Sequence, residues 1–332
     1  MTSYPNVEEA FIGELREIVE RGTNIMVRGS LTRELRARVI ELESVHERYV
    51  VIPGRNNNVF ASIAESMWVL AGRDDIDYLG AYVHRAVDYS DDGLVWRAAY
   101  GPRLRDWNGI DQLTEVTSIL SHDLSSRRAV VTIFDPDRDF VQSKDIPCNN
   151  WLHFLVRDGQ LDLNVAARST DIWWGFSGIN AFEWSLLLEV VAHWLGQAPG
   201  HLTFFTSSLH LYEHHFKKAQ ELLNRHPATS RLARAAPSTV PHFATPRDEF
   251  DAAITEWMRV EGGMRSGANL STLDCRLTDP LLMAYAQMID VFWAFKRQEV
   301  PSLIEEKLAD LGDSDLRFAA TEFLGRPHGQ SH

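Results

Sequence analysis

The chain has 332 residues and a formal net charge of −13 at pH 7, with 45% hydrophobic and 24% charged residues. This length allows one large domain or two ordinary ones, and the acidic balance argues against broad nucleic-acid binding, which requires a basic surface. Only five of the 33 basic residues are lysine. Arginine binds oxyanions in a bidentate manner, so local sites for an anionic small molecule remain open beside the alternative of genomic codon bias.

Cysteine usage and hydropathy indicate the compartment. The two cysteines, Cys148 and Cys275, lie far apart in the chain, which excludes a disulfide scaffold and favours a reducing environment. The first ten residues include acidic side chains, and no apolar run reaches the roughly 18 residues of a membrane span. We therefore expect a cytoplasmic protein with no signal peptide and no membrane contact.

Two helices are predicted in the N-terminal part of the chain. The first begins after Asn6, a helix-capping residue, carries an apolar stripe and ends at Gly22. A strand is predicted at 49–52, and the second helix runs over 58–70 with Gly72 after it.

The middle of the chain is rich in β signals. Segments 150–156 and 160–166 flank Asp158-Gly159, which predicts a hairpin with a type I′ turn. A nearly all-apolar segment at 181–195, closed by Gly196, predicts a buried helix. The other elements predicted here are strands at 129–134 and 202–206 and a helix at 212–223.

The composition changes at 224–247, which holds four prolines and is predicted to be a linker. Beyond it the pattern is helical. Helix starts are predicted at Thr245-Pro246 and at Asp279-Pro280, and the last helix ends at Gly325. We therefore expect a mixed domain over 1–223, the linker over 224–247 and a helical C-terminal extension over 248–332.

Cys148 is a candidate nucleophile because it follows Pro147 between two predicted strands. The commoner fate of a lone cysteine is to be a small buried hydrophobic residue. A nucleophilic thiol needs cationic neighbours that lower its pKa. The candidate neighbours are Arg127 and Arg128, which follow Ser126, and Arg168, which precedes Ser169.

Two histidines and one carboxylate are further candidates for chemistry. His210 and His214 have the i, i+4 spacing of a helical metal site, but no acidic or cysteine partner stands at motif spacing, so we expect no metal. Glu65 lies beside Met67 and Trp68 on a predicted helix. It is either an acid–base residue with a shifted pKa or an ordinary helix glutamate.

Taken in order, these and further residues make the chain resemble the thymidylate synthase family over about residues 20–220. The Cys148, Arg168-Ser169-x-Asp171 and His210-Leu-Tyr212 blocks are highly specific together. The remaining matches are Arg28-Gly, Glu65-x-x-Trp68-x-Leu-x-Gly72, Tyr100-Gly101, Asp111-Gln112, Ser126-Arg127-Arg128, Asp158-Gly, Gly175 and Asn180.

The resemblance implies an α/β (α+β) fold with a large twisted mixed sheet at a homodimer interface, and residues 1–223 as the catalytic domain. It implies that Cys148 adds to C6 of a pyrimidine nucleoside monophosphate. C5 then takes a one-carbon unit from 5,10-methylenetetrahydrofolate. No nucleic acid, membrane or metal partner is expected.

The resemblance also implies a role for each matched residue. Glu65 would assist proton transfers, Tyr100 would help to remove the C5 proton, and Asn180 would pair with the base. The other implied roles are phosphate binding by Arg28, Arg168 and Ser169 and by Arg127 and Arg128 of the partner subunit, sugar binding by His210 and Tyr212, and folate binding by Asp171, Gly175 and Trp174.

The chain departs from the family pattern at several positions. Asn180 favours uracil, because cytosine-using members carry aspartate there, but segment 175–180 has one residue more than usual. Asn149 replaces a histidine. Val87 and Ser90 stand at the positions where the family carries tryptophans near the folate. Trp173 and Trp174, elsewhere in the chain, are the candidates to replace them.

The C-terminus differs as well, because 325–332 is polar where the family has a short apolar tail that closes over the folate. Closure excludes water from reactive intermediates. We therefore expect hydroxymethylation of dUMP, or of a related uridylate or cytidylate nucleotide. The alternatives are reductive methylation of dUMP to dTMP and a non-catalytic nucleotide-binding regulator.

Overall fold

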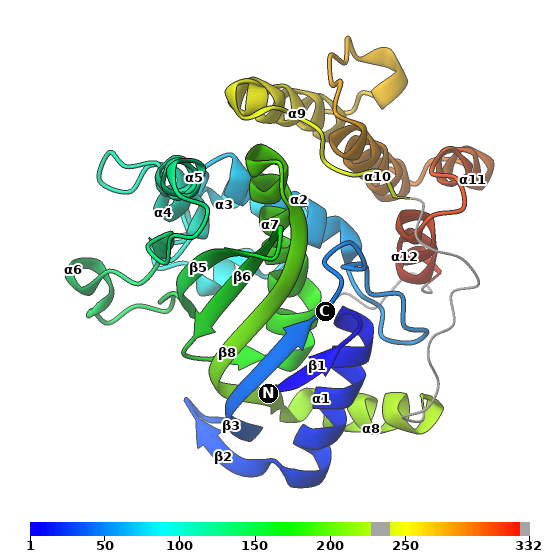
Figure 1. Cartoon of the computed structure of the whole chain (residues 1–332). Coiled ribbons are helices and arrows are strands. Elements are labelled where there is room, and N and C mark those ends of the chain that lie inside the picture. The colour runs from blue at the N-terminus through cyan, green and yellow to red at the C-terminus, as the bar shows by residue number, and fades with distance from the viewer. Residues whose placement is uncertain (227–239, 326–332) are drawn as a thin grey trace.

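A computed structural model describes residues 1–226 and 240–325 of the chain. The strands are β1 (Thr2–Tyr4), β2 (Thr23–Val27), β3 (Ser30–Leu42), β4 (Val130–Thr132), β5 (Asn149–Arg157), β6 (Gln160–Ala167), β7 (Thr170–Asp171) and β8 (Ala198–Tyr212). They form an eight-stranded sheet in the order β1-β3-β8-β6-β5-β4, with β2 paired to β3 and β7 to β8 (Figure 1). β8 is parallel to β6 and β7 but antiparallel to β3, so the predicted mixed sheet is confirmed.

The helices surround this sheet. They are α1 (Val7–Arg21), α2 (Val59–Leu70), α3 (Ile76–Leu79), α4 (Tyr100–Arg105), α5 (Gln112–His122), α6 (Pro136–Asp139), the π-helix η2 (Ile172–Asn180), α7 (Ala181–Leu195), α8 (Phe216–Arg225), α9 (Phe250–Arg265), α10 (Pro280–Lys296), α11 (Pro301–Asp310) and α12 (Asp315–Leu324). α1 and α7 pack against the sheet, and α2 packs against α7. The core lies between these layers.

Side chains of β5 and β6 alternate between buried and partly exposed positions, so one face of the sheet is covered and the other is open. The turn between them has positive φ at both Asp158 (51°) and Gly159 (77°), which confirms the predicted type I′ hairpin.

Local capping explains where the predicted helices begin and end. Asn6 accepts from the backbone N–H of Glu9 at 3.0 Å, and Asn58 accepts from Ala61 at 3.1 Å. The buried helix α7 ends at Gly196, whose φ of 62° is a left-handed conformation that suits glycine.

Two predictions of secondary structure were wrong. Residues 49–52 are buried irregular chain and not a strand, because their apolar side chains fill the core without joining the sheet. β8 continues to Tyr212, and the following helix α8 begins only at Phe216. His210 therefore lies on a strand, so the i, i+4 helical relation between His210 and His214 does not exist.

The helices α9, α10 and α12 gather beside α2 (Figure 1) and pack against it. The ring of Phe60 on α2 lies 5.3 Å from Phe292 and 5.6 Å from Phe323, and the Tyr49 and Tyr285 hydroxyls are 3.1 Å apart. The C-terminal helices therefore share a core with the N-terminal part of the chain. Much of the predicted linker (227–239) and the polar tail (326–332) lie outside the described residues. No helix in the described ranges is long and apolar enough to cross a membrane.

Glu189 on α7 joins the segment before the C-terminal helices to the main domain. It forms a buried ion pair with Arg48, accepts from the backbone N–H of Phe243 at 2.8 Å, and has His46 Nδ1 at 3.6 Å and His242 Nδ1 at 3.5 Å. Arg48 and these hydrogen bonds hold the pKa of Glu189 far below its usual value despite burial.

Candidate active site

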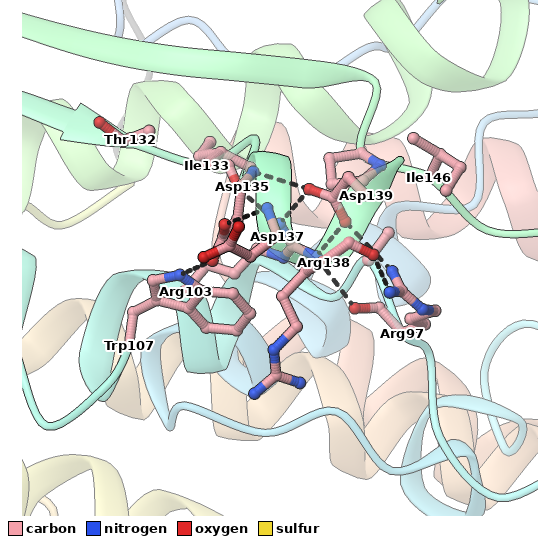
Figure 2. A network of polar contacts seen from close by, with 12 residues as sticks. Arg97, Arg103, Trp107, Thr132, Ile133, Asp135, Asp137, Arg138, Asp139 and Ile146 are labelled. Atoms are coloured by element: carbon pink, nitrogen blue, oxygen red, sulfur yellow. Dashed lines mark hydrogen bonds and ion pairs between the residues drawn. The ribbon is translucent and has the colours of Figure 1, made fainter. Parts of the chain in front are cut away.

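Cys148 ends the connection between β4 and β5, and a buried ion-pair network holds this connection in place (Figure 2). Arg103 Nη1 donates to Asp139 Oδ2 at 2.7 Å, and Nη2 donates to Oδ1 at 2.8 Å. Arg97 Nη1 adds a contact of 3.1 Å to Oδ1. Because Arg103 belongs to α4, the network fixes the Cys148 connection relative to the helix that begins at Tyr100.

The Cys148 thiol lies beside the Arg168 guanidinium, with Arg168 Nη2 at 3.7 Å from Sγ. Arg168 is itself held by the carbonyls of Pro147 (2.9 Å, from Nε) and Ile146 (2.7 Å, from Nη2). Burial raises the pKa of the Cys148 thiol, while Arg168 and Arg28 act to lower it. The thiol is therefore mostly protonated at neutral pH, and the two arginines are what stabilise its thiolate.

Tyr100 is tied to the residue after the nucleophile. Asn149 Nδ2 donates to the Tyr100 hydroxyl oxygen at 2.6 Å, which directs the hydroxyl hydrogen away from Asn149. Burial raises the pKa of Tyr100 well above its usual value, and the nearby Cys148 and Glu183 add to the rise. Tyr100 is thus a neutral hydrogen-bonding group beside the thiol.

Glu65 projects from α2 and is only 8% exposed. Burial, and after it the charge of Asp145, raises the pKa of Glu65 to about 8. Asp145 is held in place by the backbone N–H of Ala98 at 2.8 Å. Glu65 is therefore largely protonated at neutral pH and able to give a proton.

Asn180 ends the π-helix η2 and leads into α7. Its Nδ2 donates to Glu183 Oε2 at 3.5 Å. A Cβ placed on Gly175 would lie 3.8 Å from Asn180 Oδ1, so the bare backbone of Gly175 faces the amide. A π-helix holds more residues per turn than an α-helix, which accommodates the additional residue in segment 175–180.

Asp171 begins η2 and accepts from the backbone N–H groups of Trp173 (3.1 Å) and Trp174 (2.9 Å). Trp173 is buried and stacks on His215 at 4.7 Å. Trp174 is 39% exposed. Trp173 and Trp174 were both candidates to pack against the folate. Of these two, only Trp174 has a ring that is accessible enough to contact a ligand.

His210 and Tyr212 lie near the end of β8, where His210 pairs with Asp171 of β7. Their rings are 5.1 Å apart. Burial raises the pKa of Tyr212, with Asp171 and Cys148 adding to the rise and Arg28 opposing it. These electrostatic contacts indicate that Tyr212, Asp171, Cys148 and Arg28 border one region.

Comparison with known proteins identifies this arrangement. The family model for thymidylate synthase matches residues 9–248. The chain belongs to the thymidylate synthase family. The resemblance inferred from the motifs is confirmed, and the match extends beyond residues 20–220.

Within the thymidylate synthase family, the chain is similar to proteins with two different names. A deoxyuridylate hydroxymethyltransferase of Bacillus phage SP01 is 38% identical over 216 residues, which are 61% of this chain and 56% of that protein. One of Pseudomonas phage M6 is 33% identical over 84% of this chain and 80% of its own length. A putative thymidylate synthase of Methanothermobacter marburgensis is 30% identical over 67% of this chain and 96% of its own length.

The arginines expected in a thymidylate synthase-like phosphate site are spread over different surroundings. Arg28 is exposed at the β2–β3 turn, and Arg168, followed by Ser169, lies beside Cys148. Arg127 and Arg128 are exposed before β4. Arg55 is buried and donates to the Trp173 carbonyl and to Ser177 Oγ. Its guanidinium thus braces η2.

Two acidic residues of the site were not predicted from the sequence. Asp145 affects the pKa of both Glu65 and Cys148, and Glu183 contacts Asn180. Glu183 lies within the apolar pattern of α7, where a buried carboxyl has no distinguishing signal. Asp145 precedes Cys148 by three residues, and that proximity was the available clue.

Proposed function

We propose that this protein hydroxymethylates C5 of dUMP in a folate-dependent reaction that proceeds through a covalent bond between Cys148 Sγ and C6. The observation that carries the proposal is the Cys148 thiol at 3.7 Å from the Arg168 guanidinium. The two phage relatives named deoxyuridylate hydroxymethyltransferase support this choice of substrate and product.

The phosphate would bind to Arg28, Arg168 and Ser169, because guanidinium groups match the geometry and charge of a phosphate dianion. His210 and Tyr212 would contact the sugar from the end of β8. The Asn180 amide would pair with the base, donating to O4 and accepting from N3–H of uracil.

Cys148 would attack C6 as the thiolate, with its proton leaving to solvent and its charge stabilised by Arg168 and Arg28. The electron density displaced by this attack moves through C5 onto O4. Glu65 would donate a proton in that region, since its carboxyl is largely protonated at neutral pH. The neutral Tyr100 would orient water for removal of the C5 proton.

The residues at η2 fit a folate. Trp174 offers an exposed aromatic face, and each Asp171 oxygen that accepts a backbone N–H keeps a second lone pair for a ligand N–H. Gly175 adds a backbone without a side chain. When bound there, 5,10-methylenetetrahydrofolate supplies the one-carbon unit.

Reductive methylation to dTMP is the second candidate, favoured by the relative named putative thymidylate synthase. The two reactions differ in whether water reaches the site after the carbon unit is transferred. α12 packs on the loop at 53–58, where Glu322 Oε1 accepts from the backbone N–H groups of Gly54 (3.1 Å) and Asn56 (3.0 Å).

We also propose that the chain forms a homodimer through the open face of its sheet. Val130 is 44% and Phe205 is 40% exposed on strands of this sheet, which leaves apolar surface in water. The partner subunit would then receive Arg127 and Arg128 at its phosphate site. A hollow on this sheet is lined by Val130, Thr132, Phe134, Asn150, Trp151 and His153. Sedimentation of a monomer at micromolar concentration would contradict the dimer.

We further propose that the chain consists of a catalytic domain over 1–223 and a C-terminal extension over 248–332. The extension would support α2, the helix that carries Glu65. We place the protein in the cytoplasm, because Cys148 and Cys275 are free thiols.

Release of tritium from C5-labelled dUMP tests the proposed function. We expect release that requires both 5,10-methylenetetrahydrofolate and the Cys148 thiol, so that Cys148→Ala abolishes it. Binding of dUMP with no tritium release by the unaltered protein would instead support the non-catalytic regulator.

A further inference from the structure

Behind Asn180 lies a second buried carboxyl, Glu183 on α7, which is only 3% exposed. Its Oε2 accepts from Asn180 Nδ2 at 3.5 Å. Among the described residues, Glu183 Oε1 and Glu65 Oε2 are both buried without a hydrogen-bond partner. An unpaired buried carboxyl oxygen is costly, so these two atoms need an explanation.

We propose that Glu183 is a positioning residue that fixes the orientation of the Asn180 amide for uracil. The inference rests on the proposed function, because it names the base that the same site selects. Glu183 does not itself contact the nucleotide in this scheme and acts through Asn180.

The carboxyls of Glu183 and Glu65 are both buried. α2 and α7 pack together, and the charge of Glu65 is felt at Glu183. Two ionised carboxylates that interact in a buried region repel each other, so at least one of them holds a proton. A proton on Glu183 would sit on the unpartnered Oε1, because Oε2 already accepts from Asn180 Nδ2. Glu183 Oε2 would then remain an acceptor for Asn180.

The hydrogen bond from Asn180 Nδ2 to Glu183 Oε2 determines which base the amide can pair with. With its NH₂ group held by Glu183 Oε2, Asn180 retains one N–H to donate to O4 of uracil and Oδ1 to accept from N3–H. Cytosine requires the reverse, because it presents an amine at C4 and an acceptor at N3. To bind cytosine, Asn180 would have to turn its oxygen toward Glu183 Oε2, and two acceptors would then face each other.

The charged and titratable groups around this pair come from several elements. After burial, the charge of Glu65 on α2 raises the pKa of Glu183, and Glu183 in turn raises the pKa of Tyr100 on α4. Asp145, from the segment before β5, affects Glu65, and Cys148 affects Tyr100. A pH profile of Glu183 variants therefore reports on this set as a whole.

Binding of dUMP and dCMP, measured by calorimetry in the absence of folate, tests the proposal on the full chain. Glu183→Gln keeps the shape of the side chain but adds an NH₂ group that can donate to Asn180 Oδ1 and so permits the flipped amide. We expect the ratio of the two dissociation constants, which favours dUMP in the unaltered protein, to fall by about tenfold or more, the worth of one hydrogen bond. Ser185→Ala, a buried change on the same helix, is the matched control and should keep the ratio.

A second readout excludes a purely structural role. In Asn180→Ala, the further change Glu183→Gln should leave the ratio unaltered, because the amide through which it acts is gone. Equal weakening of both nucleotides by Glu183→Gln would overturn the proposal, as would an unaltered protein that binds dCMP as tightly as dUMP. The test needs no turnover, so nucleotide binding without tritium release would refute the proposed function and still decide the role of Glu183.

Discussion

The Arg103–Asp139 pair gives the sharpest prediction about what holds the nucleophile in place. Both side chains are almost fully buried, and the Asp139 carboxylate receives two hydrogen bonds from Arg103, one from Arg97 and one from the backbone N–H of Asp135 (Figure 2). The change Asp139→Asn removes the charge and turns one acceptor into a donor. Arg103 is then left as a buried cation without its counter-ion.

Removing one partner of a buried ion pair costs about 3–5 kcal/mol, a large part of a typical total stability of about 5–15 kcal/mol. With a urea dependence of about 3 kcal/mol per molar, the unfolding midpoint at pH 7 should fall by about 1 M or more. Asp88→Asn is the matched control. Its ion pair with Arg85 is exposed, so its loss should change stability by less than about 1 kcal/mol.

The pH dependence of this effect has a fixed sign. Arg103 and the hydrogen bonds lower the pKa of Asp139 below its usual value, although burial alone would raise it. The pair therefore stabilises the fold above about pH 4, the unfolded value, and loses that effect as pH falls through the folded pKa. The difference between the unaltered protein and Asp139→Asn should be constant from pH 5 to 7 and shrink in acid. Equal urea midpoints for Asp139→Asn and Asp88→Asn would refute the reasoning.

Three further predictions concern the site. Arg168→Met should slow alkylation of Cys148 at pH 8 by about tenfold for each unit by which the thiol pKa rises, and an unchanged rate would show that Arg168 does not stabilise the thiolate. Trp174→Ala should raise the KM for the folate but leave dUMP binding intact, and weakened dUMP binding would contradict its assignment. Glu65→Gln should reduce kcat by about 100-fold or more, and kcat of the unaltered enzyme should fall above pH 8, where Glu65 loses its proton. A kcat that stays constant from pH 7 to 9 would exclude Glu65 as the acid.

Elements with strong local signals were predictable from the sequence. The Asp158-Gly159 turn and the α7 boundaries at Ala181 and Gly196 follow from backbone preferences within a few residues. β3 was missed because its exposed face carries several charged residues and its long pairing with β8 is non-local. The apolar run at 49–52 has the composition of a strand, but tertiary packing decides that it remains irregular.

The candidate site was predictable where motifs carry it and not where packing does. Cys148 beside Arg168 agrees with the expectation that a cationic neighbour stands by the thiol. The helical reading of His210 failed because strand β8 runs further than its apolar core indicates. The Arg103–Asp139 pair could not be found from sequence, since its two members lie 36 residues apart in the chain. Glu183 could not be found because a carboxyl within the apolar pattern of α7 has no distinguishing signal.

The central claim is the product formed from dUMP, and mass spectrometry of that product tests it most directly. The purified protein is incubated with dUMP and 5,10-methylenetetrahydrofolate, with Cys148→Ala as the control, and the nucleotide and the folate are both analysed. The account predicts a nucleotide heavier than dUMP by CH₂O, with tetrahydrofolate as the coproduct. A nucleotide heavier by CH₂, formed together with dihydrofolate, would contradict it and identify reductive methylation.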